Sequence, residues 1–99
     1  MALSGKSLDA VSATGPGAAI MFDEPHTNHS LSYSTTGSPT SVAVELEGTI
    51  DGTNWFGLFS AGNPPFGNSI DFPLLGIRAN LTTLVGGVSP TVTAWVATA

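Results

Sequence analysis

The sequence predicts an all-β protein, a single antiparallel β-sandwich or jelly roll of seven to eight strands. Three observations lead to this fold class. Short segments alternate between apolar and polar residues, and Gly, Pro or Ser/Thr clusters interrupt the chain about every ten residues. In addition, no segment repeats apolar residues at the helical spacing i, i+3, i+4 and i+7. With 99 residues the chain has room for one such domain around one hydrophobic core.

The first third of the chain has the weakest pattern. Residues 1–17 are small and irregular, which predicts a flexible N-terminal arm, so that the sandwich domain covers residues 18–99. Residues 8–13 and 18–22 are candidate strands, and residues 31–34 alternate clearly. Loops are predicted where turn-forming residues gather, at 14–17, 23–30 and 37–40.

The clearest strand is predicted over residues 41–50, where apolar side chains alternate with polar ones. The apolar set, which we expect to face the core, consists of Val42, Val44, Leu46 and Ile50. Glu45 and Glu47 fall on the opposite face, as in a sheet with one buried side. Asp51 and Gly52 then supply the positive φ angles of a tight hairpin.

The hairpin leads into a return strand over residues 55–59. Trp55 begins this strand and is expected to close one end of the core, packed against Val44, Leu46 and Ile77. The Pro64-Pro65 pair predicts a loop over 61–68, because proline cannot donate to a strand ladder. Further strands are predicted at 69–72, 77–81 and 91–96.

Arg78 is the single arginine of the chain and lies on the outer face of the predicted strand 77–81. The neighbouring strand presents Glu45 and Glu47 on its own outer face. We therefore expect Arg78 to form an ion pair with this acidic face, either across strands or between subunits.

Charge content excludes several function classes. Seven acidic residues oppose two basic ones, for a net charge of −5. Two basic residues cannot neutralise a phosphate backbone or an anionic membrane, so neither nucleic acid nor membrane is expected as a partner. The absence of cysteine removes disulfides and thiol chemistry. With only 9% charged residues, the surface is better suited to a subunit that assembles than to a free monomer.

Two groups of residues could bind a metal ion. Asp23, Glu24, His26 and His29 could ligate zinc, but they fall in a predicted exposed loop, and a solvated loop is the favoured interpretation. Asp51, Thr53 and Asn54 with nearby Glu47 could bind calcium. The complete calcium loop is absent, however, and hairpin chemistry explains the Asp-Gly pair, so we expect no metal or other cofactor.

The sequence contains no recognisable catalytic set. Glu45 and Glu47 could resemble the carboxylate pair of a glycosidase, since they share one strand face. Two acids facing solvent or an interface are the favoured interpretation. No Gly-x-Ser-x-Gly elbow is present, and we expect a protein that is not an enzyme.

The hairpin Asp51-Gly52-Thr53-Asn54-Trp55 is followed by the strand segment Arg78-Ala79-Asn80-Leu81, and then by Gly86-Gly87 and Thr91-Val92-Thr93. This pattern, over residues 42–97, resembles small virion proteins of tailed bacteriophages. It is also similar, more weakly, to discoidin or galactose-binding jelly-roll modules. The chain departs from those modules because it is shorter and lacks their bridging cysteines.

The phage resemblance implies a capsid decoration, or cement, protein that binds the outer lattice of the major capsid protein and stabilises the head. Such proteins are often homotrimers, so the resemblance also implies a trimer located on the virion. Residues 1–9 lack a hydrophobic stretch of signal-peptide length, so we expect synthesis in the host cytoplasm. A tail or baseplate subunit is an alternative, and a glycan-binding module is the alternative from another class. A β-sandwich without catalytic residues is compatible with each of these three functions.

Overall fold

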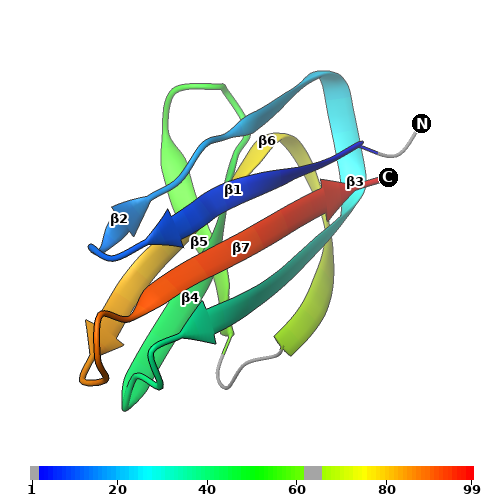
Figure 1. Ribbon diagram of the computed structural model, residues 1–99. Helices are drawn as coiled ribbons and strands as arrows, with labels where there is room; N and C mark the ends of the chain where they lie inside the picture. The colour runs from blue at the N-terminus through cyan, green and yellow to red at the C-terminus, as the bar shows by residue number, and fades with distance from the viewer. Residues whose placement is uncertain (1–2, 62–65) are drawn as a thin grey trace.

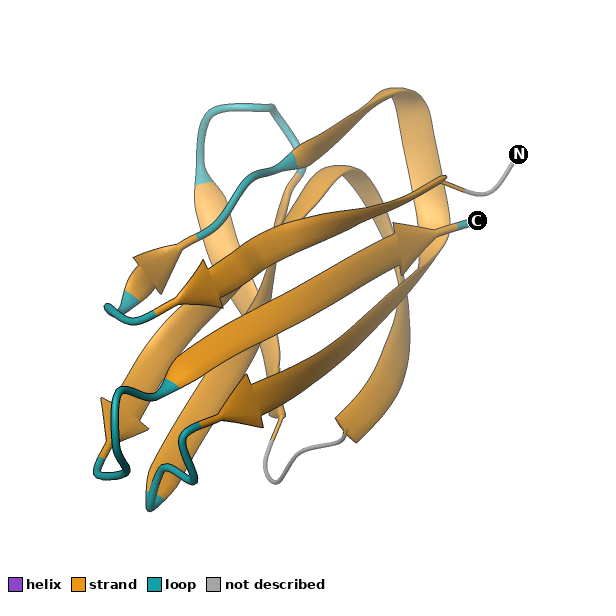
Figure 2. Cartoon of the chain, in the orientation of Figure 1, coloured by secondary structure: helices purple, strands orange, loops and turns teal. Residues whose placement is uncertain are grey.

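The computed structural model describes the backbone of residues 3–61 and 66–99, and the side chains of residues 4–60 and 70–99. It confirms the predicted fold class, because the described chain forms an antiparallel sheet of seven strands and no helix (Figure 2). No helix in the described ranges is long and apolar enough to cross a membrane. The strands are β1 (Leu3–Val11), β2 (Gly15–Pro16), β3 (Ile20–Thr36), β4 (Ser41–Thr49), β5 (Trp55–Ala61), β6 (Phe66–Val85) and β7 (Thr91–Thr98).

Two long strands fold the sheet into two layers. The strand order is β1-β7-β3-β6-β4-β5, with β2 beside β6. The 20 residues of β6 would span about 66 Å if straight, whereas the longest dimension of the molecule is 41 Å. Figure 1 shows β6 curving accordingly, so that its first part pairs with β3 and its second part pairs with β4. The β1-β7-β3 layer thus packs over the β6-β4-β5 layer.

The core lies between the layers and follows the period-two pattern. In β4, β6 and β7 alternate residues point inward and are fully buried: Val44 and Leu46, then Ile77, Ala79 and Leu81, then Val92, Ala94 and Val96. Ile50 differs from the prediction that placed it on this core face, because its side chain is 57% exposed. β4 ends at Thr49, and Gly48 takes the last inward position. A Cβ there would lie 2.6 Å from the side chain of Leu74, so Leu74 fills that space instead.

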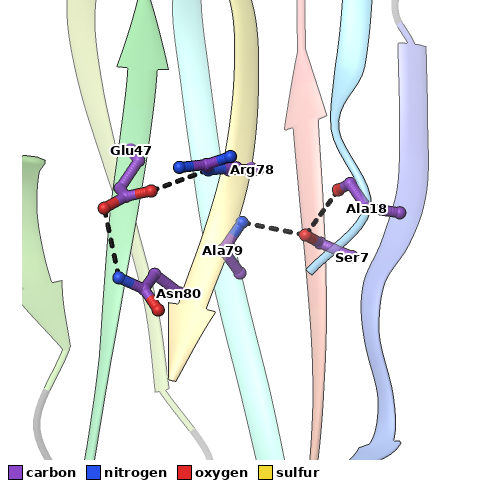
Figure 3. A network of polar contacts seen from close by, with 6 residues as sticks. All are labelled: Ser7, Ala18, Glu47, Arg78, Ala79 and Asn80. Carbon is purple, nitrogen blue, oxygen red and sulfur yellow. Dashed lines mark hydrogen bonds and ion pairs between the residues drawn. The ribbon is translucent and has the colours of Figure 1, made fainter. Parts of the chain in front are cut away.

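The N-terminal segment belongs to the sheet. Residues 1–17 are predicted to be a flexible arm, but the structure describes residues 3–11 as β1, paired with β7 along its length. Leu8 is 2% exposed, and the Ser7 hydroxyl donates to the carbonyl of Ala18 and accepts from the amide of Ala79 (Figure 3). Two register shifts and a positive φ at Ala10 interrupt the alternation of β1, which is why the sequence pattern is weak there.

Two other predicted boundaries differ from the structure. Residues 23–30 are predicted to be a loop, yet they form the middle of β3, with register shifts on either side of His26 that break the alternation. The predicted strands 69–72 and 77–81 are parts of the single strand β6, which continues through Pro73. Of the predicted loop 61–68, residue 61 belongs to β5 and residues 66–68 belong to β6, while residues 62–65 lie outside the described residues.

Candidate functional site

A polar cluster occupies the outer face of the β6-β4-β5 layer. We define this Arg78 cluster as Glu47 from β4, Trp55 from β5, and Arg78 and Asn80 from β6. Antiparallel pairing places Glu47 directly opposite Arg78, so their side chains meet on the same face. Figure 3 shows the Glu47 carboxylate on β4 beside two side chains of β6, with one oxygen directed toward Arg78 and the other toward Asn80.

Every charge in this cluster has a partner. The Arg78 Nε atom donates to Glu47 Oε1 at 2.7 Å, and Asn80 Nδ2 donates to Glu47 Oε2 at 3.1 Å. The guanidinium carbon of Arg78 lies 4.3 Å from the centre of the Trp55 ring, which places the cation over an aromatic face. The side chains of Arg78 and Glu47 are 23% and 13% exposed. Because its two oxygens accept from these donors, the Glu47 carboxylate is committed to contacts within the sheet.

The two acidic residues predicted to face Arg78 make different contacts. Glu47 pairs with Arg78, as the sequence predicts for one of the two. Glu45 turns instead toward β5, where Gly57 has no side chain. A Cβ at Gly57 would lie 2.5 Å from a carboxylate oxygen of Glu45. Gly57 therefore leaves the space that the Glu45 carboxylate occupies, and the structure places the two carboxylates in different surroundings.

Trp55 lies on the outer face, and its predicted place in the core is wrong. Strict alternation over the predicted strand 55–59 would place Trp55, Gly57 and Phe59 on one face. In the structure Gly57 pairs with Glu47 and Phe59 pairs with Leu46, which leaves Leu58 as an extra residue. This bulge reverses the alternation, so Leu58 and Phe59 both pack against the core while Trp55 lies outside it.

The β4–β5 turn is organised around the Asp51 carboxylate. Its Oδ1 accepts from the amides of Thr53 and Asn54 at 2.8 Å and from the Thr49 hydroxyl at 3.1 Å. Its Oδ2 accepts from Asn54 Nδ2 at 2.7 Å, and Gly52 adopts a φ of 83°. These donors, led by the Asn54 amide, hold the pKa of Asp51 well below its ordinary value. Its oxygens are therefore engaged by N–H and O–H groups, the opposite of what a calcium site requires.

The histidines of the predicted zinc set are part of the packing. Phe22 stacks on both rings, with centroid distances of 4.6 Å to His26 and 5.9 Å to His29. His29 is fully buried, and its Nε2 atom lies 2.9 Å from the carbonyl oxygen of His26 and 2.8 Å from that of Phe72. Its Nδ1 atom lies 2.9 Å from the hydroxyl of Thr98. Within the described residues, no group of three or more His, Cys, Asp or Glu side chains could hold a metal ion.

Sequence reasoning missed the structural roles of two residues. His29 is a candidate zinc ligand in the sequence, but its burial gave no signal, because that burial depends on the bend of β3 and on the Phe72 carbonyl of β6. Trp95 is 49% exposed and lies beneath Lys6, whose Nζ atom is 5.3 Å from the ring centre. A signal for Trp95 does exist in the sequence: it shares the polar face of β7 with Thr91 and Thr93.

The chain resembles known proteins in structure but not in sequence. No protein-family model matches the chain, and no curated protein matches it in sequence. Several solved structures do match. The chain has the fold of two prophage proteins. One is the SPBc2 prophage-derived protein YomS, with a TM-score of 0.74 and 14% identity, over 99% of this chain and 92% of YomS.

The other is the PBSX exported protein XepA, with a TM-score of 0.78 and 12% identity, over 99% of this chain and 37% of XepA. PirA aligns with a TM-score of 0.50 and 7% identity, over 99% of this chain and 93% of PirA. At these identities the likeness concerns the fold. The match to YomS extends over nearly the whole of both chains.

Proposed function

We propose that this protein is a non-enzymatic structural protein of a tailed bacteriophage, and that it decorates the outer surface of the capsid. The observation that carries the proposal is the fold shared with YomS, a prophage-derived protein, over nearly the full length of both chains. The match to XepA, a PBSX protein, also supports a phage protein. The sequence pattern of the hairpin and the following strands supports the virion class independently of these matches.

The state of the polar side chains supports a structural role. Glu47 is paired with Arg78 and Asn80, and Asp51 accepts hydrogen bonds from its own turn. His29 hydrogen-bonds within the packed part of the fold. Catalytic acids, bases and nucleophiles need access to a substrate, whereas these groups are committed to holding strands and turns together. The chain also has few charged residues, as expected for a subunit whose surface is covered by neighbours.

Self-association is supported by the unequal protection of the two end strands. β1 and β5 end the strand order. β1 carries the charged residues Lys6 and Asp9, which discourage pairing with another chain. β5 has no charged residue and pairs with β4 in the described sheet. We propose that β5 contacts the next copy in a homotrimer. In a ring of three, β5 of each copy meets a different surface of its neighbour.

The trimer would match the three-fold positions of a capsid lattice, with the major capsid protein as partner. The test is the location of the chain in purified virions of the phage that encodes it. Heads and tails are separated by density, and each fraction is probed with an antibody against the chain. The proposal expects the protein on heads, removable without opening the capsid. Finding it on tails would support the tail or baseplate alternative, and finding it in neither fraction would overturn the virion assignment.

A second measurement tests the contact. Leu58→Pro is unsuitable because Leu58 packs against the core, so Ser60→Lys is the better variant. Ser60 is exposed on β5, and a lysine there protects an edge without touching the core. The proposal expects the wild-type protein to sediment with capsids and to show the mass of a trimer by light scattering. The Ser60→Lys variant should show a smaller mass by light scattering. Ser4→Lys on β1 is the matched control and should leave the mass unchanged.

A further inference from the structure

The outer face of the β1-β7-β3 layer, which lies toward the viewer in Figure 1, has an unusual composition. Trp95 on β7 lies opposite Ser32 on β3 and opposite Lys6 on β1. The inward neighbours Leu31, Tyr33, Ala94 and Val96 are buried, so the alternation turns Trp95 and the serines outward. We call this surface the Trp95 face and define it as Lys6, Ser30, Ser32, Ser34, Thr93 and Trp95.

The Trp95 face combines one exposed indole with a row of small hydroxyl groups. Trp95 is 49% exposed, and Ser32 and Ser34 are exposed beside it. Neighbouring strands are about 4.8 Å apart, and alternate residues along a strand are about 7 Å apart. The hydroxyl groups of Ser32 and Ser34 are therefore close enough to contact a sugar ring stacked on the indole. Serine hydroxyls both donate and accept hydrogen bonds, as sugar hydroxyls do.

Charge on this face is nearly cancelled. Lys6 Nζ lies 5.3 Å from the centre of the Trp95 ring and 3.5 Å from Asp9 Oδ1. The Lys6 side chain is itself 39% exposed. Because the ammonium sits on a flexible stem, it can move aside from the ring at low cost and still donate a hydrogen bond to a ligand. The face thus offers an aromatic surface and neutral hydrogen-bonding groups, without the cluster of cations that an anionic ligand requires.

We propose that the Trp95 face is a binding site for a neutral carbohydrate chain. The apolar C–H face of a sugar ring stacks on an indole, while its equatorial hydroxyls bond to the flanking serines and Lys6. The other tryptophan cannot serve in this way, because Arg78 already lies over the ring of Trp55. An acidic polysaccharide is disfavoured by the net charge of −5. A protein interface centre is typically apolar, whereas here hydroxyl groups surround a single aromatic ring.

The experiment is affinity electrophoresis of the intact protein in native gels containing dextran, galactomannan or xyloglucan, with hyaluronan as the acidic comparison. At least one neutral polysaccharide should retard the wild-type protein, and hyaluronan should not. Trp95→Ala should weaken the retardation by about tenfold or more, since both stacking and buried area are lost. Trp95→Tyr should retain most of the retardation, because it keeps an aromatic face. Ser32→Ala should weaken it by about two- to tenfold, the range for one hydrogen bond.

Ile50→Ala is the matched control, because Ile50 is exposed to a similar extent at the β4–β5 turn and should leave binding unchanged. Circular dichroism of each variant checks that it folds, which we expect since Trp95 and Ser32 lie outside the core. The proposal is overturned if no neutral polysaccharide retards the protein, if hyaluronan alone does, or if Trp95→Ala is retarded like the wild type. Loss of self-association in Trp95→Ala without any polysaccharide binding would make this face a protein interface instead. None of these outcomes depends on where the chain lies in a virion.

Discussion

Arg78 lies over the ring of Trp55, with its guanidinium carbon 4.3 Å from the ring centre, while its Nε atom bonds to Glu47. Three strands contribute one residue each to this arrangement. Since β4 pairs with both β5 and β6, the cluster joins adjacent strands across the outer face of the layer. This arrangement fixes the side of the sheet on which Trp55 lies, and it determines what substitutions at these positions should cost.

Substitution of Trp55 tests its position outside the core. Trp55→Ala should lower the free energy of unfolding by about 1–2 kcal/mol, because it removes a half-buried stacking partner rather than a core side chain. Leu46→Ala, at a fully buried position of the neighbouring strand, should cost about 2–5 kcal/mol. Urea unfolding of both variants measures the difference. A larger loss for Trp55→Ala than for Leu46→Ala would return Trp55 to the core.

Arg78→Met should destabilise the protein by about 1–3 kcal/mol, because it leaves the partly buried Glu47 carboxylate without its cation. Arg78→Lys should be intermediate, since lysine keeps the charge but not the planar group that stacks on the indole. Glu47→Gln combined with Arg78→Met isolates the pair in a double-mutant cycle. Strictly additive losses in this cycle would mean that the two residues do not interact in solution.

Asp51 should make stability depend on pH in the acid range. Its pKa is lowered in the folded state from an ordinary value of 3.8, chiefly by hydrogen bonds from the backbone amides of Asn54 and Thr53. A lowered pKa means that the stabilisation is fully present above the unfolded value and is lost as the pH falls through the folded one. The difference in melting temperature between wild type and Asp51→Asn should therefore be constant above about pH 5 and shrink below it. A difference that grows toward acid pH would contradict this assignment.

His29 connects the bend of β3 to β6. Both partners of its Nε2 atom are carbonyl oxygens, which only accept, so Nε2 carries a proton. His29→Leu removes this donor and leaves two carbonyls with one partner fewer, at a cost of about 2–4 kcal/mol. Thr98→Val removes the hydroxyl beside Nδ1 and should cost less. Nitrogen chemical shifts of the His29 ring check the proton position directly, and an unprotonated Nε2 at neutral pH would refute it.

The local pattern of the sequence was sufficient for the fold class and for several elements. β7, the middle of β4 from Val44 to Gly48, and the part of β6 around Arg78 alternate regularly, so their inward and outward faces could be read directly. The Glu47–Arg78 pair follows from the same rule, since outward residues on adjacent strands must meet on one face. In contrast, Ile50 and Trp55 were misplaced because a strand end and a bulge lie just beside them.

The sequence by itself determined that this chain is an antiparallel sandwich with few charges, because composition and period-two alternation act locally and need no knowledge of partners. Tertiary structure alone decided that residues 3–7 extend the candidate strand that begins at residue 8, that β3 and β6 pass continuously between the layers, and that His29 is buried. It also decided which acidic residue meets Arg78 and which tryptophan remains exposed. The physical reason is that bulges and bends shift the phase of a strand by one residue, and their positions are set by contacts with distant strands rather than by the neighbouring residues.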